Sequence, residues 1–434
     1  MNVGQLNLDG YFLSTTNPLA TSDQRDLEQR AIALKAMPAF AALRAGAERR
    51  WRELAGSSPS GEAWNRFQTL IDECAFAALL KAVNGDPGRP RVLRLVMPPH
   101  DWFGMSVPGS RFGGGPGADQ SYAIVPVDYG GRYRIHGQWI GEPPADHNYT
   151  VSPNAYFMNA IGTFHHNQLA VGEDGRFTIT AGPEAGEGNH IRIAPGAQYL
   201  FIRCCRSDWR QAATALRVEA LDPPRNPPWT DAEILARATQ LALDDASGMY
   251  YWVRFYQNLA PNTVLAPALT DHVGGLVSQT TSFIRIVLAD DEAMVITIEP
   301  AGAAFHDVQL NDYWFNSVGD YYGRTATLNN AQTSLSADGT ATYVVSSTDP
   351  GVHNWLDPNA LRETLFVARW QRLPRIAGGR TPSTTARVVK LADLESVLPP
   401  DMARVDAQQR HAQCAQRLAD YQLRLADGSA DHER

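Results

Sequence analysis

The sequence predicts a mainly β protein of the α+β class, with two antiparallel β-sandwich or jelly-roll-like units framed by helices. Two stretches hold short β-rich runs separated by Gly, Pro, Asn and Asp, and helix-like segments precede, connect and follow them. The length of 434 residues also exceeds what a single hydrophobic core usually supports. We therefore expect an N-terminal helical region (1–89), a first β unit (90–222), a helical linker (223–278), a second β unit (279–400) and a C-terminal helix with its tail (401–434).

Two helices are expected before the first β unit. Residues 22–56 are rich in helix formers, with acidic residues early and arginine late, and Pro38 should divide or kink this helix. Residues 61–86 place Trp64, Phe67 and Ile71 on one face at helical spacing. The turn sequence Asn-Gly-Asp-Pro-Gly ends this second helix.

The β units are expected where the periodicity changes. Runs such as SYAIVPV, RFTITAG and AQYLFIRCC alternate with turn residues from about residue 91 to 220. After a proline-rich connector, Thr230 and Glu233 form a capping-box pattern that begins the linker helix. Strands return from Ser282 onward with FIRIVLA, EAMVITIEP and ETLFVARWQRLP. This β–helix–β order is consistent with two related β modules.

The composition is that of an ordinary globular protein, with 44% hydrophobic residues, 19% charged residues and a net charge of −8. There is no clustered Lys/Arg stripe, so we expect no nucleic acid partner. No apolar window is long enough for a membrane span, and the first residues lack the pattern of a secretory signal. The four cysteines lack metal-ligand spacing and suggest a reduced, cytoplasmic setting.

Residues 311–374 combine dense aromatics with amides and turn motifs. Trp314 precedes Tyr321 and Tyr322, an Asp-Gly hairpin follows, then a D-P-G turn, an N-W-L trio and finally Arg369-Trp370. This pattern resembles a bacterial family called domain of unknown function twelve-fourteen, and the upstream strands look like those of its long members. The resemblance covers roughly residues 90–390. It implies jelly-roll-like β domains whose chemistry is largely unassigned, so the fold transfers more safely than the function.

The motifs give little support to metal or covalent chemistry. His165 and His166 follow one strand-like run and His136 lies in another, but no HExxH, H-x-H or CxxC motif accompanies them. Strand alternation would put His165 and His166 on opposite faces. There is no G-x-S-x-G elbow, and the glycine-rich segment 111–119 lacks the spacing of a phosphate-binding loop. We expect no metal, no cofactor, and a mobile surface loop at 111–119 that could cover a pocket.

An aromatic and amide-rich group is the best candidate for a site. Aromatic side chains can stack on a flat ligand, amides can orient its polar groups, and arginine can hold a phenolate, carboxylate or enolate. Core packing would equally explain Trp355 and Trp370, and a turn cap would explain Asn354. The predicted catalytic residues are His165, His166, Tyr321, Tyr322, Arg362 and Arg369. The predicted substrate-binding residues are Tyr156, Asn159, Trp314, Asn316, Asn354 and Trp139.

Three functions remain open. The first is a cofactor-independent lyase or isomerase that acts on a bulky aromatic molecule in bacterial catabolism, for example by retro-aldol release of formaldehyde from a lignin-type phenol. A His or Tyr would then act as the base, and Arg362 or Arg369 would hold the phenolate. The second is a non-catalytic β-sandwich that binds carbohydrate or protein through an exposed aromatic strip. The third is a metal hydrolase or oxygenase built on His136, His165 and His166. A symmetric homodimer is the commonest soluble assembly, and the terminal helices could supply its interface.

Overall fold

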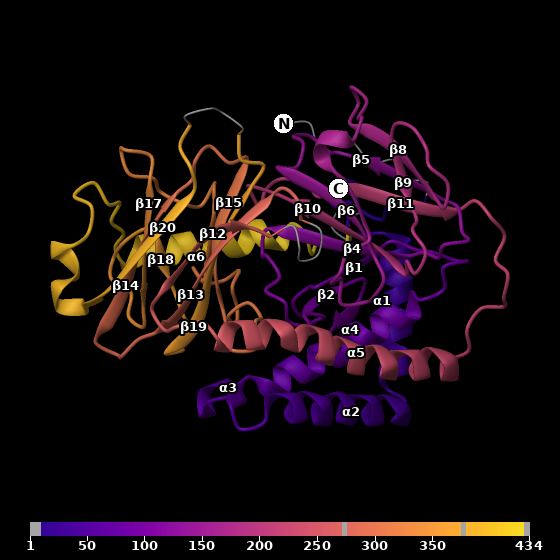
Figure 1. The fold of residues 1–434 in the computed structure, drawn as a ribbon, viewed down its shortest axis with the longest axis horizontal. Helices are drawn as coiled ribbons and strands as arrows, with labels where there is room; N and C mark the ends of the chain where they lie inside the picture. The colour runs from indigo at the N-terminus through magenta and orange to yellow at the C-terminus, as the bar shows by residue number, and fades with distance from the viewer. Residues whose placement is uncertain (1–9, 271–275, 375–378, 429–434) are drawn as a thin grey trace.

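The structure is a computed structural model that describes residues 10–270, 276–374 and 379–428. Two β-sandwiches lie side by side, and a layer of helices runs across their base (Figure 1). The predicted class, mainly β with two antiparallel sandwich units, N-terminal helices, a helical linker and a C-terminal helix, is confirmed.

The helical layer forms where the sequence places its helix signals. Helices α1 (Ser22–Lys35) and α2 (Pro38–Ala55) are separate, because Pro38 takes the first turn of α2, where its missing N–H costs no hydrogen bond. Short α3 (Gly61–Asn65) and buried α4 (Phe67–Val83) follow. The linker helix α5 (Asp231–Gln257) begins with the predicted capping box, in which Thr230 Oγ1 accepts from the Glu233 N–H. Helix α5 packs on α2 and α4 and runs beneath both sandwiches (Figure 1).

The first sandwich pairs a five-stranded sheet with a four-stranded one. The larger sheet has the order β1 (Leu93–Leu95), β4 (Gln120–Pro126), β10 (Tyr199–Cys205), β6 (Asp146–Ser152) and β7 (Gly162–His165). The smaller sheet has the order β11 (Ala215–Ala220), β5 (Tyr133–Gln138), β8 (Arg176–Gly182) and β9 (His190–Arg192). A separate hairpin joins β2 (His100–Trp102) and β3 (Met105–Val107). Aliphatic side chains such as Ile135, Val151 and Leu200 fill the space between the sheets.

The second sandwich repeats this composition. Its larger sheet has the order β12 (Val264–Leu269), β13 (Gln279–Val287), β19 (Glu363–Gln371), β15 (Phe305–Asn311) and β16 (Thr327–Asn329). Its smaller sheet has the order β18 (Trp355–Leu356), β17 (Ala341–Ser346), β14 (Glu292–Glu299) and β20 (Ser383–Lys390). Strand β12 lies inside the segment expected to be the linker. A short 3-10 helix, η2 (Leu391–Ser396), leads to α6 (Ala407–Gln422).

The two sandwiches have the same strand order. If strands are numbered within each sandwich and the β2–β3 hairpin is left out, both read 1-2-8-4-5 in the larger sheet and 9-3-6-7 in the smaller one. The sixth and seventh strands pair in parallel in both sandwiches, as β8 with β9 and as β17 with β18. Strands β10 and β19 are therefore equivalent, as are β4 and β13, and β6 and β15.

The two five-stranded sheets turn polar faces toward each other. Strands β4, β6, β10 and β15 are buried along their whole length, because one face packs in its own sandwich and the other meets the opposite unit. Hydrogen bonds cross this junction: Asn329 Nδ2 donates to Asp119 (2.5 Å), and Ser278 Oγ donates to Asp146 (2.5 Å). Buried amides and charges on strands normally signal such a shared interface, since each must find a partner.

Helix α6 also links the two sandwiches. The Tyr421 hydroxyl lies 2.6 Å from the Tyr321 hydroxyl, and the Tyr421 ring stacks on Tyr322 at 4.9 Å. On its other side the Tyr421 ring contacts Trp209 of the first sandwich at 5.1 Å. The C-terminal helix therefore fixes the two units relative to each other.

Glu28 on α1 is a buried carboxylate inside the helical layer. It accepts hydrogen bonds from Gln24 Nε2 (2.7 Å) and Trp102 Nε1 (2.6 Å). Burial raises the pKa of Glu28 to about 7, although both hydrogen bonds oppose the shift. The folded protein therefore holds a proton that the unfolded chain has already released.

We expect the free energy of unfolding to fall as the pH rises from about 4.5 to about 7, and then to level off. In the variant Glu28→Gln the free energy of unfolding should fall less over this pH range, by on the order of 2 kcal/mol, because an amide does not titrate. Urea unfolding at about pH 5 and pH 8 measures the difference. Glu53→Gln, an exposed position on α2, should keep the wild-type slope. An unchanged slope in the Glu28 variant would mean that another group causes the decline.

Candidate ligand-binding site

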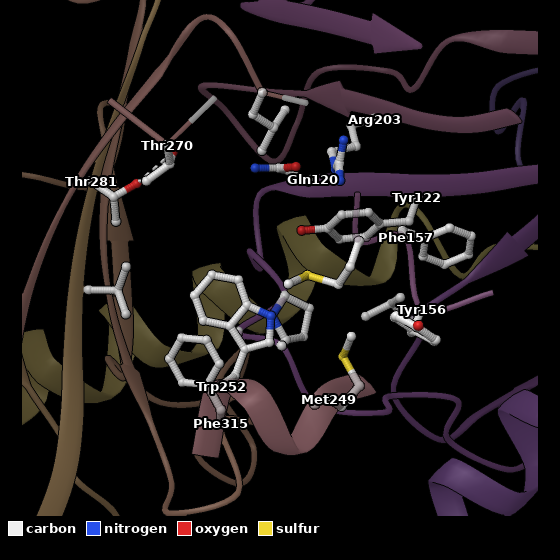
Figure 2. A pocket seen from close by; sticks show the side chains of 18 of the residues that line it. Gln120, Tyr122, Tyr156, Phe157, Arg203, Met249, Trp252, Thr270, Thr281 and Phe315 are labelled. Carbon is white, nitrogen blue, oxygen red and sulfur yellow. Dashed lines mark hydrogen bonds between the residues drawn. The ribbon is translucent and has the colours of Figure 1, made fainter. Parts of the chain in front are cut away.

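A pocket of about 130 Å³ lies where the two sandwiches meet α5. Its walls come from the outer faces of the two five-stranded sheets, from Met249 and Trp252 on α5, and from the glycine-rich loop 113–116 (Figure 2). The residues on strands are Gln120 and Tyr122 of β4, Phe201 and Arg203 of β10, Gln279, Thr281 and Phe283 of β13, and Val367 and Arg369 of β19. Each sandwich thus supplies about half of the pocket.

The strand residues of the two halves occupy equivalent positions. Arg203 on β10 faces Tyr122 across the strand pair, and Arg369 on β19 faces Thr281. Two residues further along the same strands, Cys205 pairs with Gln120, and Gln371 pairs with Gln279. The pocket is therefore lined by matched pairs, with one arginine and one glutamine from each sandwich.

The two arginines differ in their neighbours on the next strand. Arg369 lies opposite Asp307 of β15, and its Nη1 donates to that carboxylate at 2.8 Å. Its Nη2 donates to the Gly115 carbonyl at 2.8 Å. The position equivalent to Asp307 on β6 is Asn148, which lies opposite Arg203 and carries no charge. The carboxylate that neutralises Arg369 is thus replaced by an amide beside Arg203.

Arg203 is a buried cation at the polar end of the pocket. Its Nη1 donates to Thr150 Oγ1 at 3.1 Å, and its guanidinium lies 4.2 Å from the centre of the Phe201 ring. Burial lowers the pKa of Arg203 to about 10, so the group stays charged at neutral pH. Beside it, Gln120 is buried and its Oε1 lacks a hydrogen-bond partner in the described part of the chain. Figure 2 shows the two side chains side by side at one edge of the pocket.

Aromatic rings and methionine form the rest of the pocket. On the first sandwich, Phe201 stacks on Phe157 at 3.8 Å and on Tyr122 at 5.7 Å. On the opposite side, Trp252 stacks on Phe315 at 5.3 Å (Figure 2). The Tyr122 hydroxyl accepts from the Gly117 N–H at 2.8 Å, which leaves its own proton available for donation. Burial raises the pKa of Tyr122 to about 12.

The glycine-rich loop forms a tightly packed wall of the pocket. Gly113, Gly114 and Gly115 all have positive φ. A Cβ at Gly115 would lie 2.7 Å from the Phe315 ring, so only glycine fits. The Gly113 N–H donates to Asn316 Oδ1, and the Gly115 N–H donates to the Phe315 carbonyl. The expectation of a surface loop is wrong, because none of residues 111–119 is exposed.

Two of the predicted site residues line the pocket and two lie next to it. Arg369 and Tyr156 are in its wall. Asn316 holds the glycine-rich loop from behind. Trp314 is in the core, where its Nε1 donates to the Ala63 carbonyl at 2.8 Å. The aromatic segment identified from the sequence therefore supports the pocket more than it lines it.

Four predicted residues of the second sandwich lie away from the pocket lining. Tyr321 and Tyr322 pack against α6. Asn354 uses its amide to bind backbone groups of two neighbouring segments, as the turn-cap interpretation expects. Arg362 precedes β19 and pairs with Asp290, and its side chain is 67% exposed. The buried Trp314 and Tyr321 do not form an exposed aromatic strip.

The other predicted residues of the first sandwich do not line the pocket. His165 ends β7, and His166 begins a 3-10 helix, η1 (His166–Gln168), so strand alternation does not relate them. His166 stacks on Trp139 at 5.2 Å. Burial lowers the pKa of both histidines. Asn159 lies in a loop with φ of 59°, and His136 is exposed on β5 beside Glu219.

Sequence reasoning missed several residues that line the pocket, among them Gln120, Tyr122, Arg203, Met249, Trp252 and Phe315. A signal for Arg203 was present. The run Arg-Cys-Cys-Arg at residues 203–206 and the run Arg-Trp-Gln-Arg at 369–372 have the same spacing and end equivalent strands. Aligning the two β units with each other would have matched Arg203 with Arg369.

Neither a metal-binding cluster nor a membrane-spanning helix is found within the described ranges. Residues 10–270, 276–374 and 379–428 contain no group of three or more His, Cys, Asp or Glu arranged to hold a metal ion. Within the same ranges, every helix is too short or too polar to cross a membrane.

The chain resembles solved structures of uncharacterised bacterial proteins. One from Burkholderia cenocepacia is 23% identical, with a TM-score of 0.67 over 84% of this chain and 99% of that one. One from Vibrio parahaemolyticus is 11% identical, with a TM-score of 0.42 over 80% of this chain and 100% of that one. No family model and no curated protein matches the sequence. The fold is therefore shared with an uncharacterised protein of Burkholderia cenocepacia.

Proposed function

We propose that this chain is an enzyme that binds a flat aromatic molecule carrying an anionic oxygen in the pocket between its sandwiches. The observation that carries the proposal is a pocket walled by stacked aromatic rings, with the two buried arginines Arg203 and Arg369 in its lining. Arg369 faces the carboxylate of Asp307, whereas Arg203 faces the amide of Asn148. A buried cation at the edge of an aromatic pocket suits a carboxylate, phenolate or enolate.

The size of the pocket favours a ligand with one ring. Its volume of about 130 Å³ is close to that of an apolar cavity that accommodates benzene, which is about 150 Å³. The stacked pairs Phe157–Phe201 and Trp252–Phe315 would contact the two sides of the ring. A larger lignin-type dimer would place only one of its rings here unless the walls move.

The proposed reaction is cofactor-independent carbon–carbon cleavage, such as formaldehyde release from a hydroxymethyl-bearing phenol. A substrate with a benzylic hydroxyl first loses that hydroxyl as water, which converts the phenol into a quinone methide. The neighbouring hydroxymethyl group then loses its proton as the formaldehyde C=O forms, and the C–C electron pair flows into the quinone methide. The phenolate oxygen then receives the charge, where Arg203 would stabilise it. Tyr156, as a tyrosinate in the pocket wall, is the candidate proton acceptor, and Tyr122, whose pKa is raised to about 12, is the candidate proton donor.

Ligand binding tests the role of Arg203. Arg203→Met should weaken binding of phenylacetate by roughly 10- to 100-fold, corresponding to about 1.5–3 kcal/mol for a hydrogen bond to a charged group. Binding of phenylacetamide, a neutral analogue, should change little. Quenching of tryptophan fluorescence measures both affinities, and Arg134→Met, at an exposed ion pair on β5, is the control. Equal losses for both ligands would contradict the charge role.

A formaldehyde assay tests the reaction separately. Wild-type protein should release formaldehyde from a hydroxymethyl-bearing phenol, and Arg203→Met should slow this release. Binding without release would reject the lyase reaction and leave the binding proposal standing. We also propose membership in the family of domain of unknown function twelve-fourteen, a cytoplasmic location and a homodimer. The sequence pattern and composition described above support these proposals.

A further inference from the structure

Three buried arginines meet at the junction of the first sandwich with the end of α6. Arg206 follows β10, Arg417 lies on α6, and Arg424 lies just beyond the end of that helix. Their exposed fractions are 2%, 3% and 5%. Burying a guanidinium is costly unless its N–H groups and its charge are compensated.

Only one of the three arginines is fully hydrogen-bonded. Arg417 donates to the carbonyls of Arg324 and Tyr321 and to the side chain of Gln332. Arg206 uses only Nη1, which donates to the Gln211 carbonyl, and Arg424 uses only Nη1, which donates to the Ala118 carbonyl. Nε and Nη2 of both residues are buried and find no acceptor within the described ranges. Two guanidinium groups thus have donors left over at the same place.

The charge of Arg206 and Arg424 is only partly compensated. Within the described ranges neither residue forms an ion pair, and Asp119 is the carboxylate near Arg206. Its Oδ1 accepts from Trp209 Nε1 (2.6 Å) and Asn329 Nδ2 (2.5 Å), and its Oδ2 is buried without a hydrogen-bond partner among the described residues. The pKa of Arg206 is lowered to about 9, by burial and then by the positive charge of Arg424. The two guanidinium groups therefore repel each other.

Both arginines contact the segment 118–119. Arg424 Nη1 donates to the Ala118 carbonyl, and the backbone N–H of Arg206 donates to the carbonyl of the next residue, Asp119. The Arg424 guanidinium lies over the rings of Tyr421 (4.2 Å) and Trp209 (5.7 Å), which leaves its edge for other partners. An edge of a guanidinium presents parallel N–H donors, the geometry that binds an anion.

We propose that Arg206 and Arg424 together bind a small inorganic anion, such as chloride or phosphate, at the junction of the first sandwich with α6. The site is separate from the aromatic pocket and does not depend on the function proposed for it. The anion would accept the free N–H donors and offset the repulsion between the two cations. It would thereby fasten the C-terminal helix to the first sandwich.

Thermal unfolding at constant ionic strength tests this site. Replacing gluconate with chloride or with phosphate should raise the Tm of the wild-type protein saturably, by roughly 2–4 °C, and the two arms show which ion is preferred. In Arg424→Met the rise should disappear. In gluconate alone this variant should be at least as stable as wild type, because the repulsion is relieved. Arg404→Met, at an exposed ion pair with Glu395, should respond like wild type.

Crystals grown in bromide give a test that needs no variant. An anomalous peak within hydrogen-bond reach of both guanidinium groups would support the site. The proposal is overturned if water alone occupies this position and neither ion raises the Tm. It is also overturned if Arg424→Met shows the same rise as the wild-type protein, since the effect would then arise elsewhere.

Discussion

Replacing Lys81 with methionine should destabilise the protein by about 3–5 kcal/mol, because it leaves the Asp245 carboxylate buried without its cation. Lys81 on α4 and Asp245 on α5 have side chains that are 0% and 1% exposed, and Nζ lies 2.6 Å from the carboxylate. Lys81 Nζ also donates to the Ala155 carbonyl and lies 4.1 Å from the centre of the Phe112 ring. The pair therefore connects the helical layer to the walls of the pocket.

Burial raises the pKa of Asp245, while Lys81 opposes the shift. Without Lys81 the pKa should rise further, so the loss of stability in Lys81→Met should grow as the pH rises. Urea unfolding of the single variant and of Lys81→Met/Asp245→Leu separates charge from packing. The double variant should recover most of the loss, since an apolar pair has no unpaired charge. Arg30→Met breaks an exposed ion pair with Asp231 and should cost less than about 1 kcal/mol. If the double variant is as unstable as the single one, packing explains the effect.

Replacing Gly115 with alanine should cost roughly 2–4 kcal/mol, the sum of a left-handed backbone at a residue with a side chain and of overpacking. Gly115 has φ of +64°, and a Cβ there would lie 2.7 Å from two atoms of the Phe315 ring. Phe315 could move only by leaving its stack on Trp252. We therefore expect the variant to lose ligand binding as well as stability.

Gly104→Ala is the matched control for this variant. Gly104 has φ of +71°, and nothing lies within 4 Å of a Cβ placed there. It should show the backbone cost of about 1–2 kcal/mol without the steric cost. Urea unfolding and tryptophan fluorescence of both variants separate the two contributions. Equal costs at the two positions would mean that Phe315 yields easily and that the loop is not a rigid wall.

The sequence predicts the elements of this fold better than their contacts. Helix boundaries follow from Pro38 and from the Thr230–Glu233 capping box, which are local signals. The β runs alternate with turn residues and are equally local. The polar faces of β4 and β13 are not explained locally, because each faces the other sandwich, whose strands are distant in the chain.

Contacts between distant segments, which local sequence signals do not predict, also decide which site residues were predictable. Arg362 and Arg369 look alike as lone arginines among strand residues, but Arg362 precedes β19 and is exposed, whereas Arg369 lies within β19 and is buried. Arg203 lies in a run that reads as a buried strand. Its importance emerges only when the register places Asn148, rather than an acid, opposite it.

The shared strand order has a consequence for how this pocket could arise. Two copies of one ancestral sandwich, paired through their five-stranded sheets as a homodimer, would have formed a symmetric site with two identical arginines. Joining the copies in one gene, with α5 as the tether, would free each half to mutate alone. The difference between Asp307 and Asn148, which lie at equivalent positions opposite the two arginines, is an example of such divergence. A site whose two halves differ in this way can distinguish the two ends of its ligand, which no symmetric dimer can do at its axis.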